Sequence, residues 1–336
     1  MGLKLVPDNT HIHFSDFRFY AMALSAVLMI GSIFLFFDKG LNYGIDFRGG
    51  VTIEIAPPDG EEFDTDDLAI ARATAEGLDI GHVKVQEIGG IAGEDRGIVI
   101  FIEEQEVEAA PGQSDEEAKK AAETKQQEVL VLVKNSLAEA LGEVDFRRQD
   151  VVGPTVSGEL VTKGVQAVVL AVLLMLIYIW FRFEWQFSLG AILALIHDVT
   201  LTIGLFSLLQ LEFTLAIIAA LLTIIGYSMN DTVVVFDRVR ENLRKYKKMP
   251  LKELIDLSVN STLSRTLMTS LTTLLALAAL FFLGGSALRG FTAAMIWGIF
   301  VGTYSSIFVA SPLLLFTGVK RDWSEQGSDS KEVARP

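Results

Sequence analysis

Six long apolar segments constrain the fold of this chain more than any other feature of its sequence. A membrane-spanning helix needs about 20 predominantly apolar residues. Segments of this kind run over residues 19–37, 160–181, 187–209, 213–236, 267–283 and 291–316. The first is long and lacks an Ala-x-Ala cleavage pattern, which favours an uncleaved anchor over a signal peptide. The pattern predicts an all-α membrane bundle of six helices.

Acidic residues are concentrated between the first two apolar segments. Residues 38–159 hold 28 Asp or Glu and 11 Lys or Arg, a balance of −17, while the remainder of the chain balances at +3. This segregation predicts a solvated domain inserted into the bundle and argues against binding to nucleic acid. The acidity serves either solubility or contact with a basic exported substrate, and the sequence does not separate the two.

Basic residues in the short connections predict the orientation, because Lys and Arg accumulate on the cytoplasmic side. The segment 237–266, expected to be a basic cytoplasmic loop, contains Arg238, Arg240, Arg244, Lys245, Lys247, Lys248, Lys252 and Arg265. Six crossings then place the N-terminus (1–18) and the tail (317–336) in the cytoplasm. The acidic domain lies outside, in the periplasm of a cell with two membranes, and the protein is a multi-pass protein of the cytoplasmic (inner) membrane.

The inserted segment has the pattern of an α+β domain. Strands are expected at Val51–Ile55, Val83–Ile88, Gly97–Glu103 and Val144–Val151, and helices at Asp66–Leu78 and Asp115–Leu141. This order is that of a ferredoxin-like domain. The acidic stretch 103–127 contains Pro111 and Gly112, so its first part is expected to be a solvated loop.

Nothing in the sequence indicates an enzyme. The chain has no cysteine, and its four histidines form no spaced cluster, so we expect neither a metal nor another cofactor. No phosphate-binding loop and no nucleophile elbow occur. We therefore expect no ATPase activity of its own.

Ionisable residues within the apolar segments are the candidate functional residues, because a charge in hydrocarbon is costly unless it is paired, solvated or functional. Asp231 lies near the end of the fourth span and Arg265 opens the fifth, at similar depth, where they can pair. They form either a fixed ion pair or a proton pathway. The neighbouring polar residues supply a hydratable lining and favour the pathway; they are Ser228, Asn230, Thr232 and Thr269.

Two further polar residues, His197 and Asp198, are adjacent in the middle of the third span. Neighbours on a helix point about 100° apart, so the two side chains are expected to face different surroundings. They take either a direct part in proton transfer or a structural, hydrogen-bonding role in the lining.

Several stretches are similar to the SecD/SecF family, and within it to the SecF pattern. The run GIDFRGG resembles the family signature that follows the first span; its residues are Gly44, Asp46, Phe47, Gly49 and Gly50, with Ile45 and Arg48. Further similar stretches are VGPTVSGE (152–159), YIWFRFEW (178–185), IGYSMNDTVVVFDRVREN (225–242), SRTLMTS (264–270) and GTYSSIFVA (302–310).

The resemblance implies a half of the RND-type membrane architecture with SecD as an obligate partner. It also implies association with the SecYEG channel and the translocating polypeptide, with YidC and YajC as further candidate partners. SecD and SecF use the proton motive force to assist late export after the SecA ATPase has acted, and Asp231 and Arg265 match the family's proton-pathway positions. The alternative is half of a proton-driven exporter of small solutes or lipids.

Overall fold

The computed structural model describes residues 10–58, 63–88, 97–103 and 115–319. The chain forms two compact units. A helical unit comprises Met1–Asn42, Val168–Leu211 and Ala216–Pro336, and an α+β unit comprises Tyr43–Ala167 and Glu212–Leu215.

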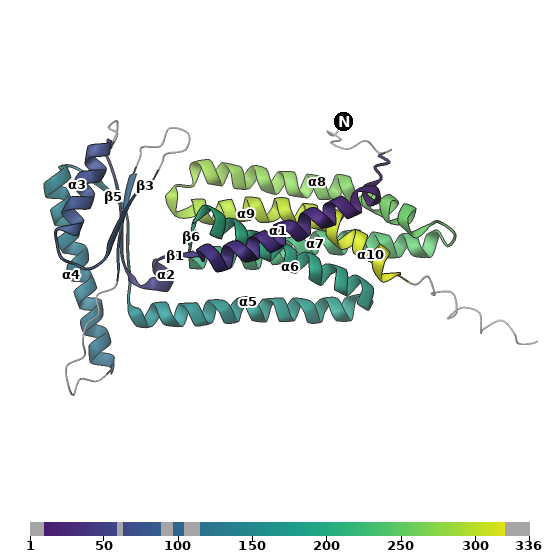
Figure 1. Cartoon of the computed structure of the whole chain (residues 1–336), viewed down its shortest axis with the longest axis horizontal. Coiled ribbons are helices and arrows are strands. Elements are labelled where there is room, and N and C mark those ends of the chain that lie inside the picture. The colour runs from purple at the N-terminus through teal and green to yellow at the C-terminus, as the bar shows by residue number, and fades with distance from the viewer. Residues whose placement is uncertain (1–9, 59–62, 89–96, 104–114, 320–336) are drawn as a thin grey trace, which may run out of the picture. The chain divides into compact units, whose positions relative to one another are not determined.

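Six helices of the described chain are long and apolar enough to cross a membrane (Figure 1). They are α1 (Arg18–Lys39), α5 (Pro154–Arg182), α6 (Trp185–Leu209), α7 (Leu215–Lys245), α8 (Leu251–Leu283), and a last span made of α9 (Ser286–Ser305), the π-helical turn η2 (Ser306–Ala310) and α10 (Ser311–Thr317). The boundary between the two units falls inside α5, after Ala167.

The centre of the helical unit consists of α6, α7 and the last span. In the most apolar stretch of each of these spans, half or more of the residues are buried, whereas less than a fifth are buried in α1, α5 and α8. Glycines allow the central helices to approach closely. A Cβ atom on Gly302 of α9 would lie 3.1 Å from the Cβ of Ser228 on α7, and one on Gly298 would lie 2.4 Å from Ile224.

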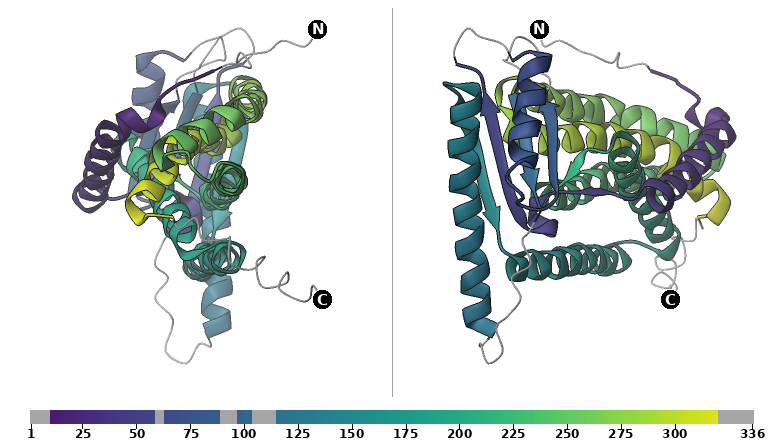
Figure 2. Two further views of the ribbon diagram at one scale, coloured as in Figure 1. Left: turned by 90° about the vertical axis from the view of Figure 1, so that its right-hand side faces the viewer. Right: turned by 60° about the vertical axis from the view of Figure 1, so that its left-hand side comes forward.

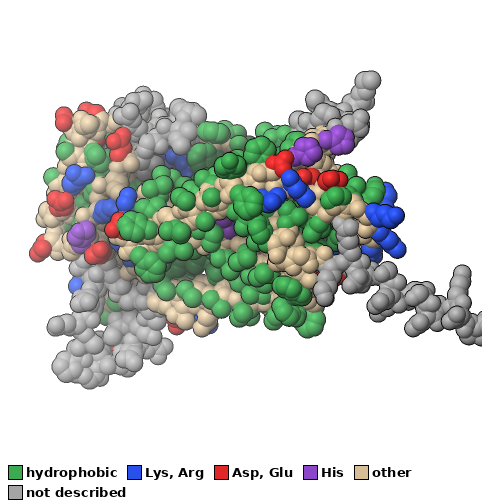
Figure 3. Space-filling view, turned by 45° about the vertical axis from the view of Figure 1, so that its right-hand side comes forward, with side chains coloured by type: hydrophobic (Ala, Val, Ile, Leu, Met, Phe, Trp, Pro, Cys, Tyr) green, Lys and Arg blue, Asp and Glu red, His purple; other side chains and the backbone are tan. Residues whose placement is uncertain are grey.

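The helices α7 and α8 extend beyond the apolar segments that the sequence delimits. The segment 237–266, expected to be a loop, is helical except for the short connection between Lys245 and Leu251. The reason is amphipathicity: Val239 and Leu243 of α7 are buried in one apolar cluster with Leu254 and Val259 of α8. Figure 3 shows charged side chains gathered at this end of the helical unit and apolar ones along it.

Residues 10–17, directly before α1, also contain an element that the sequence did not predict. A short 3₁₀ helix, η1 (Phe14–Phe17), is fixed to α8 by the buried carboxylate of Asp256. Its Oδ1 accepts hydrogen bonds from the backbone N–H (2.8 Å) and the hydroxyl (2.7 Å) of Ser15.

The α+β unit contains the strands and helices in the order expected from the sequence. They are β2 (Gly50–Ala56), α3 (Thr65–Glu76), β3 (Val83–Ile88), β4 (Gly97–Ile102), α4 (Asp115–Leu141) and β5 (Asp145–Val152). The strands form one antiparallel sheet in the order β3-β4-β2-β5. The expected loop before α4 falls largely on residues 104–114, outside the described residues.

One face of this sheet is covered by α3 and α4, which pack side by side (Figure 2). The core between them is aliphatic: Ile53 and Ile55 of the central strand β2 are fully buried, as are Val133 and Leu137 of α4. Asp64 caps α3 by accepting hydrogen bonds from the backbone N–H groups of Asp66 and Asp67.

The last span contains a π-helical turn next to a proline. Pro312 has no N–H to donate to the preceding turn of helix, which favours a local departure from α-helical geometry. At this turn the Ser311 hydroxyl donates to the carbonyl of Ser306 at 2.7 Å. The distortion matters because π-helical turns change the direction of side chains and are frequent at functional sites.

Candidate functional site

Asp231 is a buried acid in the helical unit. It lies on α7 and is 7% exposed. The Thr266 hydroxyl of α8 donates to Oδ1 at 2.6 Å, and the Ser306 hydroxyl of η2 donates to Oδ2 at 2.8 Å. Three different helical elements therefore meet at one carboxyl group. The hydroxyls can hydrogen-bond to this group whether it is ionised or protonated, because a hydroxyl both donates and accepts.

The direct ion pair that Asp231 and Arg265 could form is absent from this structure. None of the ion pairs within 4.0 Å between described residues joins them. Neighbours on a helix point about 100° apart, so Thr266 faces Asp231 while Arg265 is exposed on the surface of the chain. Among the described residues, no cation therefore lies within ion-pair distance of Asp231.

The pair His197–Asp198 lies in the same helical unit and is fully enclosed. The two residues are 1% and 0% exposed. Contrary to the expectation of separate surroundings, their side chains contact each other, with His197 Nδ1 2.9 Å from Asp198 Oδ1. The other carboxylate oxygen accepts hydrogen bonds from the hydroxyls of Ser228 and Ser305.

The structure divides the expected polar lining into two groups. Ser228 and Thr232 are buried in the bundle, whereas Asn230 and Thr269 are exposed on its surface. Sequence reasoning missed the hydroxyl donors Thr266, Ser305 and Ser306 as functional candidates. The available signal for the last two was a pair of adjacent serines within an apolar span.

The signature loop, residues 43–50, lies in the α+β unit and is bonded to the segment that starts α7. Gly44 N–H donates to the Phe213 carbonyl at 2.9 Å, and Asp46 Oδ2 accepts from the Leu215 N–H at 2.7 Å. The Asp46 carboxylate therefore caps the N-terminal end of α7. Gly49 and Gly50 have φ angles of 71° and 117°, which explains the glycines.

Glu212 lies beside this loop. Desolvation by the surrounding protein raises the pKa of its carboxyl group, although the residue is exposed to solvent on one side. The charge of Arg148 opposes the rise in pKa, and the charge of Asp46 adds to it. Gly44 is glycine partly for space, because a Cβ atom there would lie 2.8 Å from a Glu212 carboxylate oxygen.

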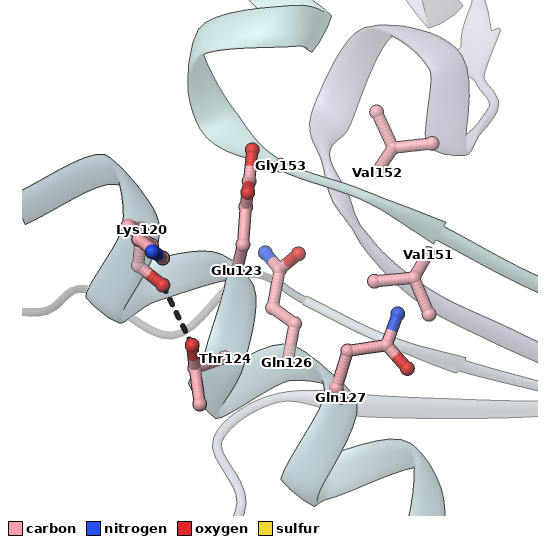
Figure 4. A pocket seen from close by; sticks show the side chains of 8 residues that line it. All are labelled: Lys120, Glu123, Thr124, Gln126, Gln127, Val151, Val152 and Gly153. Carbon is pink, nitrogen blue, oxygen red and sulfur yellow. Dashed lines mark hydrogen bonds between the residues drawn. The ribbon is translucent and has the colours of Figure 1, made fainter. Parts of the chain in front are cut away.

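A pocket of about 430 Å³ lies between α4 and the end of β5. Figure 4 shows its lining, which is Lys120, Glu123, Thr124, Gln126, Gln127, Val151, Val152 and Gly153. Gln126 is 2% exposed, and its amide atoms have no hydrogen-bond partner among the described residues. The pocket belongs to the α+β unit and is distinct from the buried acids of the helical unit.

Two family descriptions match the chain. Residues 132–320 match "Protein export membrane protein SecD/SecF, C-terminal", and residues 34–56, which contain the signature loop, match "SecD/SecF GG Motif". The first match covers more than half of the chain. The chain belongs to the SecD/SecF family.

Relatives within the SecD/SecF family match over nearly the full chain. It is 45% identical to the protein translocase subunit SecF of Rhodobacter capsulatus over 98% of this chain and 96% of that protein. It is 43% identical to the protein translocase subunit SecDF of Brucella abortus, covering 97% of this chain and 40% of that one.

A solved structure gives the same result. The crystal structure of SecDF from Thermus thermophilus, a translocon-associated membrane protein, matches with a TM-score of 0.72 and 36% identity. The match covers 94% of this chain and 39% of the SecDF chain, so this chain spans well under half of that protein. Family membership and six apolar helices together make this a multi-pass membrane protein.

Proposed function

We propose that this chain is an accessory subunit of Sec protein export that, with SecD, uses the proton motive force to assist late translocation of polypeptides across the cytoplasmic membrane. It does so without an ATPase of its own. The observation that carries the proposal is Asp231, a buried carboxyl group that accepts hydrogen bonds from two hydroxyls and has no described cation within ion-pair distance. The names of the relatives favour polypeptides over small solutes as the substrate.

A carboxyl group in this setting can bind and release a proton. A buried charge without a partner is unfavourable, so Asp231 is more stable when it is protonated or when a cation approaches it. Its hydroxyl partners donate to the carboxylate and accept from the acid. One proton that crosses 100 mV releases about 2.3 kcal/mol, so a few protons can bias a conformational step.

The proton pathway is completed by the partner. Polar side chains of α7 and α8 are exposed, among them Asn230, Arg265 and Thr269. An arginine facing lipid is costly, which favours a protein surface over lipid at this position. The fused SecDF relatives support SecD as that surface. SecYEG, YidC and YajC are proposed as further partners.

The proposed topology places both termini and the basic ends of α7 and α8 in the cytoplasm, and the acidic α+β unit in the periplasm. Because the basic residues follow the positive-inside rule, the acidic insertion falls on the opposite side. We assign a ferredoxin-like fold to the α+β unit. Its β-α-β-β-α-β order and antiparallel sheet support this assignment.

Proton-driven export into inverted membrane vesicles tests the proposed function. Export by Asp231→Asn in the presence of a proton gradient should fall to the level measured without the gradient, because an amide cannot carry the proton. Export driven by ATP alone should remain. Arg265→Ala should lower the same gradient-dependent part, and SecD should still co-purify with both variants.

The matched control is Asp237→Asn on the same helix. Asp237 is half-exposed and is bound to Arg182 at 3.0 Å, so its amide variant tests the loss of an acid on α7 outside the buried site. Its gradient dependence should match that of the wild type. Unchanged gradient dependence in Asp231→Asn, with the complex intact, would contradict the proposal.

A further inference from the structure

Asp198 is a second buried acid, and all its polar contacts are uncharged or histidine groups. His197 Nδ1 lies 2.9 Å from Oδ1, the Ser305 hydroxyl donates to Oδ2 at 2.8 Å, and the Ser228 hydroxyl donates to the same oxygen. With a neutral imidazole, this fully enclosed cluster carries one uncompensated negative charge. Such a charge is unfavourable in a low-dielectric interior.

His197 has a free site for the proton that would remove this charge. A carboxylate only accepts hydrogen bonds, so Nδ1 carries the hydrogen shared with Asp198 and Nε2 is left as an acceptor. Nε2 is buried and has no hydrogen-bond partner among the described residues. The imidazole ring stacks on Tyr304, with ring centroids 6.0 Å apart.

No other charged group in the described helices serves as the counter-charge. The titratable neighbours are Tyr304 on α9, whose hydroxyl donates to the Ala21 carbonyl of α1, and Asp231 on α7. The charged residues of α1 lie at its ends, and η2 and α10 contain none. Arg265 of α8 is exposed on the surface of the bundle.

Two short connections join the Asp198 cluster to Asp231. On the last span, the adjacent residues Ser305 and Ser306 donate to Asp198 and Asp231 respectively, at 2.8 Å each. On α7, Ser228 donates to Asp198 and lies one helical turn before Asp231. The π-helical turn begins at Ser306, so the two serine hydroxyls reach different acids where the helix changes its geometry.

We propose that the His197–Asp198 pair is a second proton-binding site of this chain, coupled to Asp231 through Ser305 and Ser306. The proton adds to His197 Nε2, the Nδ1–H bond to Asp198 is kept, and the charge of the pair changes from −1 to 0. Two acids held by neighbouring residues titrate as a coupled system, so occupancy of one site alters the other. This inference rests on the proposed function of Asp231 and adds a second site to it.

Nitrogen NMR of the whole complex in lipid nanodiscs, labelled with ¹⁵N-histidine, tests the proposal. The His197 signals are those that disappear in His197→Gln. As the pH is lowered from about 9 to about 5, Nε2 of His197 should change from unprotonated to protonated. In Asp198→Asn this change should move to a pH lower by about one unit or more, because the stabilising negative charge is gone.

Thr202→Val is the matched control. The Thr202 hydroxyl is buried one turn further along α6 and donates to the Asp198 backbone carbonyl at 2.8 Å, so its loss perturbs the same helix but leaves the charge of the pair intact. The His197 titration should be unchanged in this variant. A His197 signal that stays in one state throughout, or titrates alike in wild type and Asp198→Asn, would overturn the second site.

The coupling has its own readout. Asp231→Asn should shift the His197 titration to lower pH, whereas independence of the two signals would overturn the coupling. These outcomes are separate from the export assay. If Asp231→Asn loses gradient-driven export but His197 does not titrate, only the second site is contradicted. If His197 titrates as expected but Asp231→Asn keeps gradient-driven export, only the proposed function is contradicted.

Discussion

Single residues in this protein show how burial governs proton affinity, and Glu212 gives a direct test outside the membrane-spanning helices. Desolvation raises the pKa of its carboxyl group above the ordinary value of 4.5. The folded protein therefore binds this proton more tightly than the unfolded chain does. At neutral pH the ionised Glu212 lowers the free energy of unfolding. This loss disappears at a pH where the residue is protonated in both the folded and the unfolded state.

We expect Glu212→Gln to raise the thermal midpoint of unfolding at pH 7 by about 1–2 °C, because the amide needs no ionisation. The gain should shrink as the pH falls through the raised pKa and vanish below about 4.5. Thermal unfolding at several pH values measures this. Glu128→Gln, on the exposed surface in the middle of α4, is the control and should show no gain. A gain that persists at pH 4 would point to a cause other than ionisation.

The buried acids show the same principle inside the bundle. Asp231 accepts hydrogen bonds from hydroxyls of two other helical elements, and Asp198 accepts them from two hydroxyls and contacts His197. A hydroxyl can reverse its donor and acceptor roles, whereas an arginine favours only the ionised acid. The surroundings of Asp231 suit an acid that changes its protonation state, whereas at Asp198 the proposed proton site is the neighbouring His197.

At the scale of elements, the close contact between α7 and α9 holds this cluster together. It depends on small residues, because a Cβ atom at Gly298 would lie 2.4 Å from two atoms of Ile224, and one at Gly302 would lie 3.1 Å from Ser228. Ser228 and Ser305 can then reach Asp198 from opposite helices.

We expect Gly298→Ala to destabilise the protein by about 1–3 kcal/mol, because the added methyl group must displace Ile224 or separate the helices. The thermal midpoint of the purified complex measures the loss. Combining it with Ile224→Ala should recover part of the stability, since the clash is removed. Gly31→Ala on α1 is the control, because no described atom lies within 4 Å of its added Cβ. Equal effects at Gly298 and Gly31 would contradict the packing argument.

At the scale of the whole molecule, the helical unit exposes a few polar residues on its surface. Asn230 and Arg265 are exposed there, although they belong to helices that cross the membrane. The α1 surface is different, with exposed apolar residues such as Ile30 and Phe34. The contrast indicates a protein partner at the first surface and lipid at the second.

Because the chain has no cysteine, a single introduced thiol provides a site-specific test within this subunit. Asn230→Cys should react with a membrane-permeant maleimide in the isolated chain, and about tenfold more slowly in the complex with SecD, where the interface excludes the reagent. Ile30→Cys should react at the same rate in both. Equal rates for Asn230→Cys in the two preparations would show that SecD does not cover this side.

The sequence by itself determined the features that depend on local composition. Six apolar segments predicted six long helices, because the length of a span is set by hydrocarbon thickness. Alternating and helical patterns predicted the elements of the α+β unit within a few residues. Asp231 stood out because a charge in an apolar run is visible without any structure.

Only the tertiary structure decided which groups meet. Thr266, rather than Arg265, faces Asp231 because a step of one residue rotates a side chain by about 100°. Ser305 and Ser306 reach acids 107 and 75 residues away in the chain, and no local pattern encodes such a contact. The basic ends of α7 and α8 are helical because each buries the other's apolar face, so their lengths depend on packing between elements.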